Sequence, residues 1–165
     1  MLAIADLQKQ LAESPTDDVD LRVYLKQFNL SLGASMIDDL ARITLSATAD
    51  GPPVTANVSV SLGLIVTELV INALKHGFPD QHAGHIKVAY TASDAGWQLL
   101  VEDDGIGIGD TDSVVPGLGT SIVNALAEHP GASITVSDGA PGTIVMITNP
   151  AITAGAAADL AETAV

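Results

Sequence analysis

Apolar residues recur at helical spacing in four stretches of the chain, and this spacing predicts four helices. The first stretch is interrupted at Ser14 and Pro15, because these residue types are typical of turns. The third stretch is the longest, and its helix is expected to begin at a cap on Asn57 or Ser59. The four predicted helices cover residues 2–11, 19–36, 57–75 and 120–128.

Alternating apolar and polar residues predict five strands, which cover residues 42–48, 85–92, 97–102, 132–137 and 143–148. Glycine-containing turns at 93–96 and 138–142 join four of these strands into two hairpins. Helices that precede and interrupt a largely hairpin-connected sheet predict an α+β fold. We therefore expect a two-layer α/β sandwich, in which a mixed, mostly antiparallel sheet packs on about three helices.

The composition fits one globular domain. The chain has 165 residues, of which 47% are hydrophobic and 16% charged, so it is long enough for one well-packed core. Aromatic residues make up only 3%, and the core must therefore be built mainly from Val, Ile, Leu and Ala.

The formal net charge of -14 argues against DNA or RNA as a partner, because the chain has no basic patch to release counterions. The absence of cysteine excludes disulfides and thiolate metal sites. No signal peptide is recognisable at the N-terminus, so the cytoplasm is the expected compartment. The longest apolar stretch, residues 62–74, contains Glu68 and Asn72, which predicts a buried helix and no contact with a membrane.

The central helix carries a narrow polar stripe on an otherwise apolar surface. Ser61, Glu68, Asn72 and Lys75 fall on this stripe at about 100° per residue. Glu68 and Asn72 offer hard oxygen ligands suited to Mg²⁺, and Lys75 and the neighbouring His76 could neutralise phosphate charge. The alternative is a solvated helix face with a Glu–Asn pair and a lysine near the helix C-terminus.

An acidic turn follows the strand at residues 97–102. It reads Asp103-Asp104-Gly105-Ile106-Gly107, and an aspartate in this place can accept a hydrogen bond from an exocyclic amine, which selects adenine over guanine. An ordinary Asp-Gly turn is the alternative. A calcium loop of the EF-hand type is excluded, because Leu100 and Thr111 stand where it requires Asp and Glu.

A third element, Pro116-Gly117-Leu118-Gly119-Thr120-Ser121, opens the helix predicted at 120–128. Glycines before a helix N-terminus leave an array of free amides that bind phosphate. The alternative is a simple cap on Thr120 or Ser121. Neither a Gly-Lys-Ser/Thr phosphate loop nor the third glycine of a dinucleotide fingerprint is present.

The order of these elements, followed by a closing Gly-Thr strand, closely resembles the ATP-binding domain of the GHKL superfamily. Sensor histidine kinases, gyrase-type ATPases, Hsp90-type chaperones and mismatch-repair ATPases belong to this superfamily. Residues 68–77 resemble its N box, 103–107 its first G box and 117–119 its second. The resemblance covers roughly residues 19–150 and implies the Bergerat-type ATP-binding fold.

Two stretches resemble one subset of bacterial histidine kinases in more detail. They are Asn72-Ala-Leu-Lys-His-Gly-Phe-Pro79 and Gly119-Thr-Ser-Ile-Val-Asn-Ala-Leu126, and the subset is related to the HWE kinases. The Trp-x-Glu motif of HWE proteins is absent, since Trp97 lies five residues before Glu102. The chain therefore resembles the sister group.

The resemblance implies ATP and Mg²⁺ as cofactors and assigns roles to the residues of the three boxes. Asn72 would coordinate the metal, and Glu68 would complete the catalytic and metal-binding pair by orienting water or the attacking group. Asp103 would recognise adenine with Thr143 nearby. The resemblance further implies that Gly105 and Gly107 shape the turn, that Lys75 and His76 lie on the phosphate side, and that phosphate is held by Gly117, Leu118 and Gly119.

Such kinases carry a phosphoacceptor histidine on a dimerisation helix ahead of the ATP domain. The N-terminal helices here contain no histidine; the histidines are His76, His82, His85 and His129. We interpret residues 1–18 as a remnant of the dimerisation helix with its linker, 19–150 as the ATP-binding catalytic domain, and 151–165 as an Ala-rich tail. The acceptor helix and the response regulator are expected on other segments or proteins. The chain alone is expected to be inactive in autophosphorylation, and a homodimer would form through the missing helix.

Two other functions are compatible with the same boxes. An anti-sigma-factor serine kinase shares the fold and the motifs. A non-catalytic phosphotransfer or interaction module shares the fold but usually loses the boxes, which this chain retains at Glu68, Asn72 and Asp103.

Overall fold

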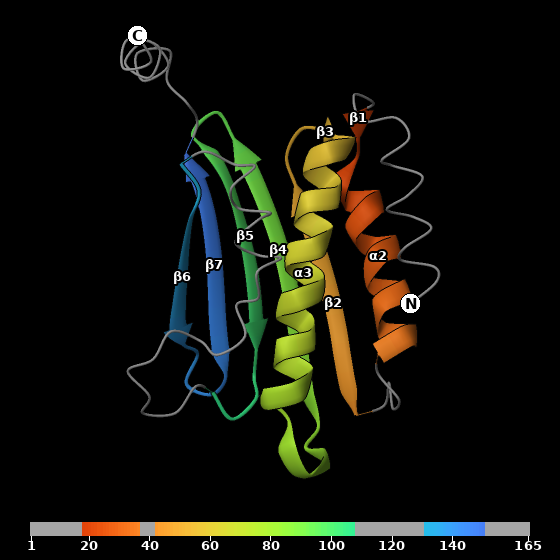
Figure 1. Ribbon diagram of the computed structural model, residues 1–165, viewed down its shortest axis with the longest axis vertical. Coiled ribbons are helices and arrows are strands. Elements are labelled where there is room, and N and C mark those ends of the chain that lie inside the picture. Colours follow the sequence, from red (N-terminus) through yellow and green to blue (C-terminus); the bar gives the residue numbers. More distant parts are fainter. Residues whose placement is uncertain (1–17, 37–41, 108–130, 151–165) are drawn as a thin grey trace, which may run out of the picture.

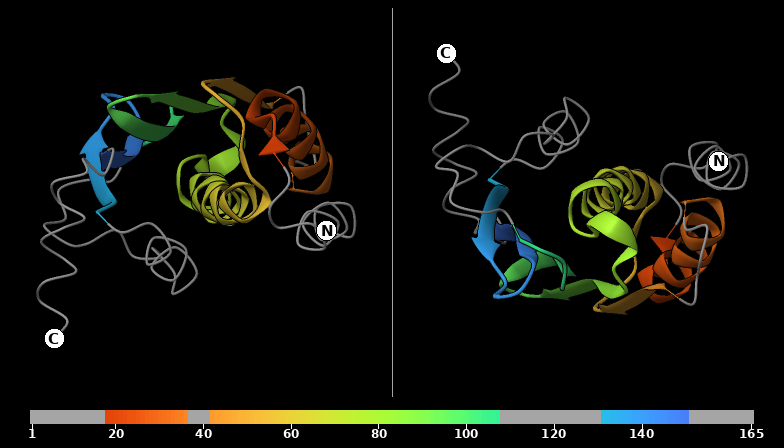
Figure 2. Two further views of the ribbon diagram at one scale, coloured as in Figure 1. Left: turned by 90° about the horizontal axis from the view of Figure 1, so that it is seen from above. Right: turned by 90° about the horizontal axis from the view of Figure 1, so that it is seen from below.

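The computed structural model of the chain describes residues 18–36, 42–107 and 131–150. Within them, a mixed five-stranded sheet is covered on one face by two long helices (Figure 1). The view along the layers, in Figure 2, shows both helices on the same side of the curved sheet. This arrangement confirms the α+β two-layer sandwich. The helix predicted at 120–128 and the segments interpreted as helix remnant and tail, 1–17 and 151–165, lie outside the described residues.

The sheet has the strand order β2-β4-β5-β7-β6. The pairing of β2 with β4 is parallel, and the other three pairings are antiparallel, as expected for a mostly hairpin-connected sheet. Each predicted strand is present within two residues of its predicted ends. The five strands are β2 (Ile43–Asp50), β4 (Gly84–Ser93), β5 (Gly96–Asp103), β6 (Ser133–Asp138) and β7 (Thr143–Pro150).

The helices are α2 (Leu21–Met36) and α3 (Ala56–His76), and a short 3-10 helix, η1 (Pro79–Gln81), follows α3. A two-stranded sheet of β1 (Asp18–Val19) and β3 (Val54–Thr55) was not expected from the sequence. It ties the chain just before α2 to the chain just before α3.

The predicted cap of the central helix is wrong. Thr55 occupies the cap position, and its side chain makes no capping hydrogen bond. The helix starts at Ala56 because β3 runs directly into it, so Asn57 and Ser59 already lie in its first turn. The Ser59 hydroxyl instead donates to the carbonyl oxygen of Thr55, at 3.2 Å.

The core lies between the helices and the sheet and is mainly aliphatic, with four buried aromatic residues, Tyr24, Phe28, Phe78 and Tyr90. Full burial of one such side chain contributes about 1.5–3 kcal/mol. The largest fully buried side chains of the core are those of Phe28, Leu25, Leu32, Ile43, Leu62, Ile65, Ile86, Leu99, Ile147, Val66 and Val70.

The length and composition of α3 would allow it to cross a membrane, and it is the one such helix in the described part of the chain. However, half of its apolar window is buried inside the domain, as in the core helix of a globular protein. This burial agrees with the prediction of a buried central helix.

Candidate functional site

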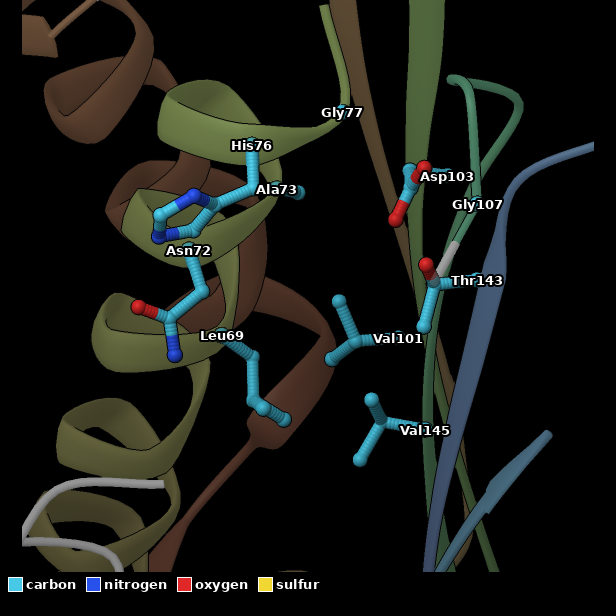
Figure 3. Close-up of a pocket in the computed structure, with 10 residues that line it drawn as sticks. All are labelled: Leu69, Asn72, Ala73, His76, Gly77, Val101, Asp103, Gly107, Thr143 and Val145. Carbon is cyan, nitrogen blue, oxygen red and sulfur yellow. The ribbon is translucent and has the colours of Figure 1, made fainter. Parts of the chain in front are cut away.

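A pocket of about 230 Å³ lies between the C-terminal half of α3 and strands β5 and β7. Figure 3 shows the helix forming one wall, with Asn72 and His76, and the strands forming the other, with Asp103 and Thr143. The pocket, which Gly107 also lines, therefore brings together five predicted site residues from three separate segments. Its complete lining is Leu69, Asn72, Ala73, His76, Gly77, Val101, Asp103, Gly107, Thr143 and Val145.

The helix wall follows from helical geometry. Asn72 and His76 are four residues apart, so they lie one above the other on the same face of α3. Asn72 is half-buried, and His76 is exposed at the pocket mouth. Glu68 and Lys75, which share the predicted stripe, do not line the pocket. The half-buried Glu68 lies one turn before Asn72, and Lys75 is exposed near the helix end.

Asp103 is the buried charged group of the pocket. Only 6% of the residue is exposed, and it stands at the end of β5 directly opposite Thr143 of β7. The Gly105 amide donates to its carboxylate at 3.0 Å. Burial raises the pKa of Asp103, and the neighbouring charge of Asp104 raises it further. Hydrogen bonds from the Gly105 amide and from the amide and hydroxyl of Thr143 act in the opposite direction and lower the pKa. The carboxylate is therefore fixed in place by donors on one side, while it lines the cavity.

The raised pKa of Asp103 predicts a pH dependence of folding. The pKa is above the unfolded value of 3.8 in the folded chain, so the folded state holds the proton more tightly. The stability that this tighter proton binding provides is fully present below pH 3.8, and it is lost as the pH rises through the raised pKa of the folded chain. We expect the free energy of unfolding of the wild type, relative to Asp103→Asn, to decrease over that window in urea titrations. Asp94→Asn, which removes an exposed carboxylate from the β4–β5 turn, should show no such trend.

The turn after Asp103 packs backbone to backbone against the end of α3. Ile106 donates its amide hydrogen to the carbonyl oxygen of Gly77, at 2.9 Å. A Cβ atom on Gly105 would overlap the Gly77 backbone, although Gly105 itself does not require a positive φ. Gly107, in contrast, has a positive φ of 76°. Gly105 is therefore needed for close approach, and Gly107 for the direction of the chain.

Replacing Gly105 with alanine is expected to destabilise the fold by about 1–3 kcal/mol, because the added methyl group meets backbone that cannot move aside. The added methyl group would also displace the turn and with it Asp103, whose carboxylate accepts a hydrogen bond from the Gly105 amide. Thermal unfolding and nucleotide titration of the variant measure the two effects.

Gly131→Ala is the matched control. Gly131 has φ of 84°, but among the described residues a Cβ atom there would meet only the Asn149 side chain, at 3.9 Å. Its cost is therefore conformational strain alone, about 1–2 kcal/mol, and it lies outside the pocket. If both variants lost nucleotide affinity equally, the contact between Gly105 and Gly77 would not be what shapes the pocket.

The floor of the pocket is apolar and was not predicted. Leu69, Val101 and Val145 project between the two walls in Figure 3. The signal was present in the spacing: Leu69 lies three residues before Asn72 on the helix, and Val101 and Val145 each lie two residues from a predicted site residue on a strand. An apolar floor with a few polar groups at its edges suits a flat ring with hydrogen-bonding substituents.

The remaining predicted site residues are not all placed. Gly117, Leu118 and Gly119 lie outside the described residues, and Gly105 lies against Gly77 without lining the pocket. The described residues contain no group of three or more His, Asp or Glu side chains that could hold a metal ion by themselves. Among the described residues, Asn72 and Glu68 of α3 carry the side-chain oxygens that the sequence predicted as metal ligands.

Comparison with known proteins gives two kinds of relatives, histidine kinases and anti-sigma F factors. The chain is 38% identical over 118 residues to the blue-light-activated histidine kinase 2 of Erythrobacter litoralis, a match that covers 69% of this chain and 34% of that protein. It is 28% identical to the anti-sigma F factor of Shouchella clausii, covering 76% of this chain and 86% of that protein. The chain thus spans about a third of the length of the curated histidine kinase that it matches.

Solved structures agree with these matches. The histidine kinase domain of the Erythrobacter litoralis blue-light activated histidine kinase EL346 superimposes with a TM-score of 0.72 at 31% identity, covering 90% of this chain and 71% of that one. Residues 57–152, more than half of the chain and including both walls of the pocket, match the family described as histidine kinase-, DNA gyrase B- and HSP90-like ATPase. The chain belongs to this ATPase family.

Proposed function

We propose that this chain is the ATP-binding catalytic domain of a cytoplasmic two-component histidine kinase. It would present the γ-phosphate of Mg-ATP to a histidine on another segment or protein. The observation that carries the proposal is the buried Asp103 carboxylate, which faces Asn72 and His76 across one pocket. Membership of the ATPase family and the match to a histidine kinase domain support the same function.

Adenine would occupy the sheet side of the pocket. Its exocyclic amine would donate to Asp103, whose carboxylate is held in place by Gly105 and Thr143. The ring would lie over the apolar floor formed by Leu69, Val101 and Val145. A buried carboxylate is costly unless it is hydrogen-bonded, so a ligand that adds a further donor is favoured.

The phosphates would lie toward the helix wall. Asn72 and Glu68 offer two hard oxygen donors one turn apart, too few to enclose a metal, which fits Mg²⁺ bound partly by water and substrate phosphates. When bound, Mg²⁺ neutralises phosphate charge during phosphoryl transfer. Lys75 and His76 follow at the end of the same helix and would add positive charge near the phosphates, while the glycines at 117 and 119 would supply amide donors.

Catalysis by such a site depends mainly on positioning the γ-phosphoryl group and the attacking histidine. The γ-phosphoryl group would pass to a nitrogen of the acceptor histidine and leave ADP in the pocket, and Glu68 would orient the attacking group. The acceptor helix and the response regulator would be supplied by other segments or proteins.

Calorimetric titration with Mg-ATP and Mg-ADP tests the proposal first. We expect both nucleotides to bind, and γ-labelled ATP to label an added acceptor-helix fragment but not the chain alone. Absence of any nucleotide binding would instead indicate a non-catalytic interaction module.

An anti-sigma-factor serine kinase is the second candidate. It is favoured by the match to the anti-sigma F factor, because that match covers 86% of the relative. Transfer of the label to a serine of a purified antagonist protein, with none to an acceptor histidine, would establish this function instead.

A further inference from the structure

A second cavity, of about 360 Å³, lies between α2 and the edge strand β2, away from the nucleotide pocket. We call it the α2–β2 groove, and its lining is Lys26, Asn29, Leu30, Gly33, Ala34, Leu45 and Ala47. Leu30 at its rim is 68% exposed, and Val23, two turns earlier on α2, is 54% exposed. Val23 and Leu30 form an apolar stripe along α2 that the described part of the chain leaves uncovered.

A buried polar group in the groove also lacks a partner. Asn29 is only 7% exposed, and neither polar atom of its carboxamide has a hydrogen-bond partner. A buried amide without a hydrogen bond is costly, at about 1–3 kcal/mol in proteins generally. The groove therefore holds a buried amide that the described residues do not satisfy and whose two polar atoms water does not reach.

The charge of this surface is opposite to that of the rest of the molecule. Helix α2 contains Arg22 and Lys26 but no Asp or Glu, in a chain of net charge -14. Arg22 pairs with Asp20 just before the helix, at 3.5 Å, so Lys26 is the cation that lines the groove. A second copy docking on the groove by two-fold symmetry would bring Lys26 toward its own counterpart, which is unfavourable. The expected occupant is therefore an acidic, amphipathic segment.

We propose that residues 1–17 of this chain dock along the α2–β2 groove as an amphipathic helix antiparallel to α2. This segment carries Leu2, Ile4, Leu7 and Leu11 at rough helical spacing, and it has three acidic residues against one lysine. The proposal is independent of the proposed function, because the groove and the nucleotide pocket share no residue.

The length and the attachment point of the segment fit the groove. Its last residue adjoins Asp18, which lies just before α2 and which the pairing of β1 with β3 fixes against Thr55 at the start of α3. A helix before Pro15 ends by about Glu13, and Ser14 to Asp20 then form the connection. With an equal rise of about 1.5 Å per residue on both helices, Leu11 comes level with Val23 and Ile4 with Leu30. The segment thus covers the two exposed apolar residues of α2, and its attachment raises its effective concentration at the groove.

Cross-linking tests the placement directly, because the chain has no cysteine. In the full chain carrying Ile4→Cys and Leu30→Cys, a short bis-maleimide should produce a cross-link within one chain, identified by mass spectrometry after proteolysis. The control pair is Ile4→Cys with Thr135→Cys, since Thr135 lies on β6 at the opposite edge of the sheet. Equal yields for the two pairs, or cross-links only between two chains, would overturn the proposal.

A stability cycle provides the second measurement. An aspartate at a position as exposed as Leu30 normally changes stability very little. If the segment docks, Leu30→Asp should lower the melting temperature by about 2–4 °C or more, and this loss should disappear in a chain that also carries Ile4→Asp. Additive effects of the two substitutions would contradict docking. Unchanged ATP affinity in all variants would keep this result separate from the proposed function.

Discussion

Asn72→Ala is expected to remove the Mg²⁺ dependence of ATP affinity and to reduce phosphoryl transfer by about 10²–10³-fold. Asn72 lines the helix wall opposite Asp103 and carries the amide oxygen that the proposed site offers to the metal. Alanine removes that oxygen while it favours the helix, so α3 should remain intact. Titration with ATP in the presence and absence of Mg²⁺, together with labelling of an acceptor fragment, measures both effects.

Asn57→Ala is the control for this substitution, because Asn57 lies on the same helix but is exposed and far from the pocket lining. Its melting temperature and nucleotide affinity should stay close to those of the wild type. Retention of Mg²⁺-dependent ATP binding by Asn72→Ala would show that the metal is held elsewhere. The assignment of Glu68 and Asn72 would then have to be abandoned, although the adenine side of the pocket would stand.

The part of the site that could be predicted from the sequence depends on local periodicity. A helical period places Asn72 and His76 on one face, and a strand that ends at Asp103 places its carboxylate at the edge of the sheet. Thr143 was expected near Asp103 only through the resemblance to the GHKL superfamily, and the structure sets it opposite Asp103 through the register of β5 with β7. The positions of Asn72, His76 and Asp103 are relations within single elements, whereas the pairing of β5 with β7 joins strands that are not neighbours in the sequence.

The unpredicted part depends on contacts between distant segments. Gly105 is required because Gly77 lies against it, and nothing local at either residue reveals this approach. The parallel pairing of β2 with β4 requires the whole of α3 to cross between them, and β1 and β3 have two residues each, too few to show alternation. The predicted stripe on α3 was also wider than the pocket, so it included Glu68 and Lys75, which do not line it.

Asp103→Asn is expected to weaken ATP binding by roughly 10- to 150-fold, the value of one hydrogen bond to a charged group. An asparagine has a single acceptor oxygen, and the donors around it are the Gly105 amide, Thr143 and the adenine amine. At least one of these donors then loses its partner in a buried place. Asp94→Asn, with the same change of charge at an exposed turn, should leave the affinity unchanged.

A comparison of ATP with GTP affinity distinguishes base recognition by Asp103 from a general disruption of the pocket. Adenine presents an amine donor where guanine presents the O6 acceptor, so the carboxylate favours ATP, whereas the amide group of an asparagine can donate to guanine. The ratio of ATP to GTP affinity should therefore fall in Asp103→Asn, even though ATP binding itself weakens. An equal loss for both nucleotides would mean that Asp103 only supports the turn at Gly105 and does not read the base. That outcome would move adenine recognition to another group of the pocket and would leave the buried carboxylate with a structural role.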